Sequence, residues 1–93
     1  MTLTDSDSDN IVSNSDVVTI TATFSESMAA TPTLSLSGIN SNALMSATAS
    51  DSVWTYAWTV STTATSTTAT VSGTDLAGNA YSGTDSITFT IDN

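Results

Sequence analysis

The sequence predicts an all-β domain in which antiparallel sheets pack face to face. Thr and Ser together make up 37 of the 93 residues, and β-branched Thr, Val and Ile favour extended chain. Apolar residues make up 39% of the chain and alternate with polar ones over short stretches, which is the period of a half-buried strand. We expect no helix. A chain of this length forms one domain, residues 1–93.

Two segments carry the clearest strand pattern. Residues 17–24 alternate apolar side chains with Thr, so one face of this strand is expected in the core. Residues 53–60 repeat the pattern with large aromatic side chains, which we expect at the centre of the core. The side chains predicted to point inward are Val18, Ile20, Ala22, Phe24, Trp54, Tyr56, Trp58 and Val60.

Two further strands are expected near the C-terminus. Apolar residues alternate with Thr over residues 87–91, and a second strand passes through Ala69 and Val71 and ends near Gly73. Both are predicted to be antiparallel to their neighbours. The low-complexity run at residues 61–70, STTATSTTAT, is interpreted as a loop that leads into the strand through Ala69.

The first half of the chain contributes shorter strands. We expect one at residues 34–36 and another at residues 44–49, separated by a turn at residues 38–42. Leu3 and the pair at residues 11–12 suggest a broken first strand. About seven short strands with turns every 8 to 12 residues are typical of an immunoglobulin-like sandwich with Greek-key connections. A Greek-key barrel is the main alternative.

The charge composition limits the possible functions. The chain has nine acidic residues and no Lys, Arg or His, which gives a net charge of −9. Its carboxylates can be stabilised only by hydrogen bonds, distance or bound cations. Binding to nucleic acid or an anionic membrane is excluded because both need cationic side chains. Without Cys there is no disulfide or zinc-thiolate site. Residues 1–5 have neither the basic nor the apolar region of a signal peptide, and no apolar run has the length of a membrane span, so we expect neither.

The first candidate site is an acidic segment near the N-terminus. Asp5, Asp7 and Asp9 occupy alternate positions, and Asp16 falls at the twelfth position counted from Asp5. Carboxylates at this spacing can converge on one Ca²⁺ when the backbone curls, as in a calcium loop of the EF-hand type. Asn10 replaces the Gly of that loop type, and strands flank the segment. The alternative is a solvated acidic loop at the sheet edge.

A second acidic segment, DLAGN, lies at residues 75–79. Asp75 is expected to accept backbone N–H groups across a turn, while Gly78 or Asn79 takes a positive φ angle. Asp75 and Asp92 are weaker candidates for calcium binding, because strand ends gather at the poles of a sandwich. Both carboxylates would then lie at one pole.

Catalysis is not expected. Without His, Cys or Lys the usual pairs of nucleophile and base cannot be built, and a glycosidase would need two acids opposed across a cleft. Trp54, Tyr56 and Trp58 would offer a sugar-stacking platform if they faced solvent. Their alternation with Thr and Ala favours a place in the core instead.

Three segments, residues 17–28, 54–60 and 74–80, contain in that order the motifs TFSE.M, W.Y.W and D.AGN. This set resembles the bacterial Ig-like repeats of large surface adhesins. The resemblance implies tandem copies exported to the cell surface or medium, often with calcium near the domain junctions. Repeats of that family usually continue into a linker containing Thr and Pro, whereas this chain stops at Asn93. We expect a cut at the repeat boundary, although a single-domain filament subunit would end in the same way.

From these observations we expect an extracellular structural spacer in cell adhesion, stabilised by calcium, whose partners are neighbouring repeats or identical subunits. One alternative is a filament subunit that assembles by strand complementation, which predicts a missing or unpaired edge strand. Another is a module that binds a glycan or protein on a host or environmental surface. Solvent exposure of Trp54 and Trp58 distinguishes this last alternative from the spacer.

Overall fold

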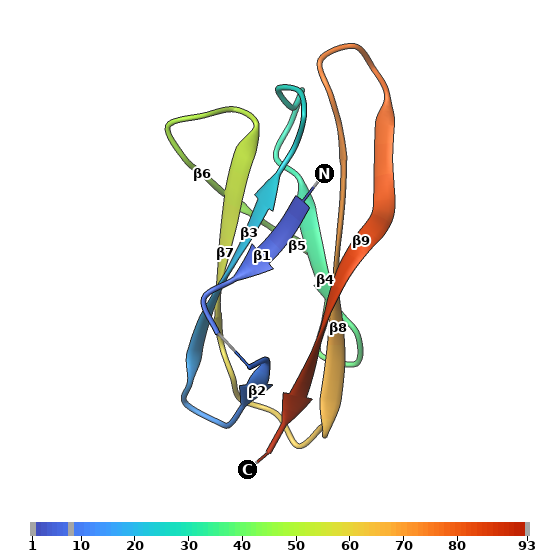
Figure 1. Cartoon of the computed structure of the whole chain (residues 1–93). Helices are drawn as coiled ribbons and strands as arrows, with labels where there is room; N and C mark the ends of the chain where they lie inside the picture. Colours follow the sequence, from blue (N-terminus) through green and yellow to red (C-terminus); the bar gives the residue numbers. More distant parts are fainter. Residues whose placement is uncertain (1, 8, 93) are drawn as a thin grey trace.

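The computed structural model contains two β-sheets stacked face to face (Figure 1). It describes residues 2–7 and 9–92, and no residue in these ranges lies in a helix. The strands are β1 Thr2–Asp5, β2 Ile11–Val12, β3 Val17–Thr23, β4 Thr33–Leu36, β5 Asn40–Leu44, β6 Ser46–Ala47, β7 Val53–Thr59, β8 Ser66–Thr74 and β9 Ala80–Ile91.

The sheets contain four and five strands. The first has the order β1-β3-β7-β6 and the second the order β2-β9-β8-β4-β5. Neighbouring strands are antiparallel, except that β2 runs parallel to β9. The prediction of an all-β, sandwich-like architecture is therefore confirmed.

The first strand is broken, as expected, and its two halves join different sheets. β1 pairs with β3, which places Leu3 in the core, whereas β2 crosses to the other sheet and pairs with β9. Two hydrogen bonds beside β2 hold it to the end of the chain. The Thr90 amide donates to the Asn10 carbonyl at 2.9 Å, and the Asp92 amide donates to the Val12 carbonyl at 2.7 Å. The first and last strands thus lie side by side.

The core follows the predicted alternation. Trp54 and Trp58 on β7 are only 8% and 4% exposed, and the Trp58 ring meets the Phe89 ring of β9 edge to face at 5.4 Å, which joins the two sheets. Tyr56 is only partly buried, and its hydroxyl accepts a hydrogen bond from Nδ2 of the Asn40 side chain at 3.3 Å. The other side chains predicted to point inward are buried: Val18, Ile20, Ala22, Phe24 and Val60. From the second sheet, Leu34, Leu36, Ala69, Val71 and Ile91 are buried as well.

The loop predicted at residues 61–70 is wrong in its second half, because β8 already begins at Ser66. Thr67 points to the same inward face of β8 as Ala69 and is only 2% exposed. Its hydroxyl donates to the Ser37 carbonyl at 2.9 Å. A buried hydroxyl with a hydrogen-bond partner can therefore take a core position, which a purely apolar pattern does not reveal.

The single strand predicted at residues 44–49 is also wrong. β5 begins earlier, at Asn40, directly after a turn in which Gly38 has a φ of +75°. The chain then changes sheets at Met45, which is 4% exposed, and continues as the two-residue strand β6. This change of sheet and the short strands β2 and β6 raise the number of strands in the described residues to nine, instead of about seven.

Candidate functional site

The alternating aspartates between β1 and β2 form a succession of turns in which each carboxylate caps backbone amides. Asp5 Oδ1 accepts the Asp7 amide at 2.8 Å, and Asp7 Oδ1 accepts the amides of Asp9 and Asn10, both at 3.1 Å. Asp9 Oδ1 accepts the Ile11 amide at 3.1 Å. Such local hydrogen bonds are characteristic of Asp in turns. The spacing that suggested metal ligands therefore also organises the loop itself.

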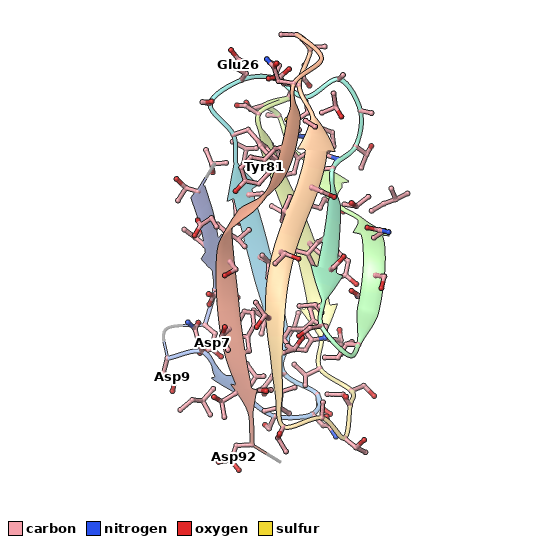
Figure 2. All side chains as sticks on the ribbon, turned by 90° about the vertical axis from the view of Figure 1, so that its right-hand side faces the viewer. Asp7, Asp9, Glu26, Tyr81 and Asp92 are labelled. Carbon is pink, nitrogen blue, oxygen red and sulfur yellow. The ribbon has the colours of Figure 1, made fainter. Side chains whose placement is uncertain are left out.

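Carboxyl groups in this loop are close enough to affect each other. A side-chain hydrogen bond with Asp9 raises the pKa of Asp7 above its ordinary value, and the same hydrogen bond, aided by the Ile11 amide, lowers the pKa of Asp9. The side-chain amide of Asn10, with its nitrogen turned toward Asp5, donates to both carboxylate oxygens of Asp5 at 3.0 and 3.1 Å. Asp7 and Asp9 lie on the same side of the molecule in Figure 2. A bound cation would relieve the repulsion between these two carboxylates.

Asp16 belongs to a different turn. Its Oδ2 accepts the Ser13 amide at 2.9 Å, and its main-chain carbonyl accepts the Val60 amide at 2.9 Å. Within residues 2–7 and 9–92, no three acidic, His or Cys side chains lie close enough together to hold one metal ion. Four residues were predicted as ligands: Asp5, Asp7, Asp9 and Asp16. The structure brings together only those in the loop between β1 and β2, and Asp16 is not among them. Calcium binding here stays a prediction.

The turn at residues 75–79 has the predicted geometry. Asp75 Oδ1 accepts the Asn79 amide at 2.8 Å, and the Asp75 carbonyl accepts the Gly78 amide at 3.0 Å. Gly78 has a φ of +88°, in the left-handed region that favours glycine. The structural role proposed for this motif is therefore confirmed.

Sequence reasoning missed the partner of Asp75, which is Glu26 in the segment after β3. A hydrogen bond between the two carboxyl groups raises the pKa of Glu26, and the Asn79 amide together with Glu26 lowers the pKa of Asp75. The bridge between Met28 and Asp75 brings these segments together. Figure 2 shows Glu26 at one end of the molecule and Asp92 at the other. The expectation that Asp75 and Asp92 share a pole is therefore wrong.

A hollow of about 200 Å³ lies beside the pair formed by Glu26 and Asp75. The Phe24 and Tyr81 rings form part of its wall and meet edge to face, with centroids 5.7 Å apart and planes at 84°. Phe24 directly follows β3 of one sheet, and Tyr81 lies on β9 of the other. Phe24, Met28 and Tyr81 form its apolar wall. Glu26, Asp75 and Asn79 form its polar rim.

The aromatic platform considered for sugar binding is not exposed, since Trp54 and Trp58 are both buried. The Trp54 Nε1 group donates to the Asp51 carbonyl at 2.9 Å, so its polar atom also has a partner within the fold.

Comparisons with protein-family models, with curated proteins and with solved structures found no match. The resemblance to bacterial Ig-like adhesin repeats therefore stays a prediction from the sequence motifs. The described residues contain no helix long and apolar enough to cross a membrane.

Proposed function

We propose that this chain is an immunoglobulin-like module that acts as a mechanical spacer in a microbial cell-surface or secreted protein, with no catalytic role. The strand orders support this finer fold assignment. The sheet β1-β3-β7-β6 matches strands A-B-E-D of an immunoglobulin sandwich, and β9-β8-β4 matches G-F-C in the other sheet. β5 then adds a strand beside C, and β2 adds one beside G.

The observation that carries the proposed function is the parallel pairing of β2 with β9. The molecule is elongated, 43 × 23 × 18 Å, and the N- and C-termini of the chain lie apart along the long axis (Figure 1). Tension on the ends would pull β2 and β9 in opposite directions along their length. The bonds from Thr90 to Asn10 and from Asp92 to Val12 would then be loaded together in shear rather than broken one at a time.

Single-molecule pulling from the two ends tests this role. We expect one cooperative unfolding event at high force. Asp92→Pro removes the amide that donates to the Val12 carbonyl and should lower the unfolding force. Asp92→Ala is the matched control, because it removes the same carboxylate but keeps the amide. Unfolding of the native chain at forces no higher than those that peel a hairpin from its end would remove the basis for a spacer.

Calcium is the cation that we propose for this module. Support comes from nine carboxylates without a cationic side chain and from the close pair Asp7–Asp9, in which the pKa of Asp7 is raised by its neighbour. Ca²⁺ prefers carboxylate and carbonyl oxygens and would offset this repulsion. An extracellular location, where calcium is available, follows from the resemblance to adhesin repeats.

The two alternatives have less support. Strand complementation predicts a missing or unpaired edge strand, whereas each strand in the described residues pairs within its own chain. A glycan-binding aromatic platform requires an exposed Trp54 and Trp58, and both are buried.

A further inference from the structure

The hollow at the Glu26 end of the sandwich combines two chemically different surfaces. Phe24, Met28 and Tyr81 form an apolar wall, and the carboxyl groups of Glu26 and Asp75 lie at its rim. At about 200 Å³ it is smaller than the roughly 300 to 1,000 Å³ of sites for drug-sized ligands. The space therefore suits one side chain or a comparably small group.

The carboxyl groups at the rim of the hollow indicate that its ligand is a cation. The two carboxyl groups are held within hydrogen-bonding reach of each other, because Glu26 follows β3 and Asp75 follows β8 at the same end of the fold. A cation between them would replace repulsion with attraction on both sides. Aromatic rings also attract cations, and Phe24 and Tyr81 lie in the adjoining wall.

The apolar wall of the hollow indicates that the ligand carries its charge on an apolar stem. A lysine side chain packs its methylene stem along apolar surface and keeps its ammonium group at the polar edge. Met28 can adapt to such a stem because its thioether side chain is flexible. The chain itself contains no Lys, Arg or His, so an identical subunit has no cationic side chain to place here.

We propose that this hollow binds a lysine side chain of a different protein, with the stem against Phe24, Met28 and Tyr81 and the ammonium group between Glu26 and Asp75. This site would give the module a protein partner, independently of the proposed spacer role. The net charge of −9 would draw a basic partner toward the module over longer distances.

The test is an NMR titration of the full chain at constant ionic strength, with Nα-acetyl-lysine N-methylamide as the probe. We expect saturable shifts at the amides of Phe24, Asn79 and Tyr81. The norleucine analogue has the same stem without the ammonium group and should give no saturable shift. Equal binding of the neutral analogue, or shifts reproduced by sodium chloride alone, would overturn the proposal.

Two variants with equal loss of charge locate the site. Glu26→Gln should weaken binding of the lysine probe about two- to fivefold, the effect of removing one partner of an exposed ion pair. Asp51→Asn is the control, because the Asp51 side chain does not line the hollow and its main-chain carbonyl still accepts the amide of Met28. Equal weakening by both variants would show a general charge effect and refute the site.

A third arm identifies the source of the ammonium group. n-Butylamine carries the same four-carbon stem and one ammonium group on a free small molecule. We expect it to bind no more tightly than the lysine derivative, which has the same charge. Tighter binding would overturn the assignment to a protein side chain.

Discussion

Trp58 joins the two sheets through its contact with Phe89. Its side chain is 4% exposed, and its ring meets that of Phe89 at 5.4 Å and 64°. Trp58→Ala removes this contact, worth about 0.5 to 1.5 kcal/mol beyond the buried area, and leaves a cavity between β7 and β9. The total cost should be about 3 to 5 kcal/mol. Since 1 kcal/mol corresponds to about 4 to 8 °C in a domain of this size, the melting temperature should fall by about 12 to 40 °C.

Urea denaturation followed by far-UV circular dichroism measures this loss. Trp54→Ala should fall in the same range, because Trp54 is 8% exposed and its Nε1 group donates to the Asp51 carbonyl. Val17→Ala is the control, since Val17 is 62% exposed on β3 and should lose no more than about 0.5 kcal/mol. A loss below about 1 kcal/mol for Trp58→Ala would show that the indole is not packed between the sheets, and the reasoning about the core would be wrong.

The remaining predictions concern the carboxylates. At about 100 times its Kd, calcium should stabilise the fold by about 2.7 kcal/mol and raise the melting temperature by about 10 to 20 °C beyond sodium at equal ionic strength. Changing Asp5, Asp7 and Asp9 to Asn keeps the oxygens that cap the turns and should abolish this gain; a gain that persists would refute a site in this loop. Carboxyl NMR should find the pKa of Glu26 above its ordinary value and that of Asp75 below its own. Asp75→Asn should lower the pKa of Glu26, and an unchanged value would contradict the pairing. By linkage, the stability from Asp75 is lost as the pH falls through its depressed pKa, and that from Glu26 is lost as the pH rises through its raised pKa.

Local patterns were sufficient to locate most strands. The alternation at residues 17–24 and 53–60 predicted which side chains enter the core, because the two-residue period of a strand depends only on neighbouring positions. The turn at residues 75–79 was predictable for the same reason, since the Asp75 carboxylate and the positive φ of Gly78 act within five residues. The acidic loop was located correctly as well, although its carboxylates face their own backbone.

The assignment of strands to sheets was decided only by the tertiary structure. Residues 44–49 look like one strand, yet Met45 carries the chain from one sheet to the other because its side chain is buried at the crossing. Thr67 enters the core only because the Ser37 carbonyl, 30 residues away, accepts its hydroxyl. No local pattern contains that information.

The composition of the chain determined that its carboxylates have no cationic side chain to pair with, and this follows from the inventory of residues alone. Which carboxylates meet was decided by the fold. Glu26 and Asp75 come from the ends of β3 and β8 in different sheets, and the bridge from Met28 to Asp75 brings them to one pole while Asp92 leaves at the other. Electrostatic interaction depends on distance in space, and the sandwich creates that proximity between residues far apart in sequence.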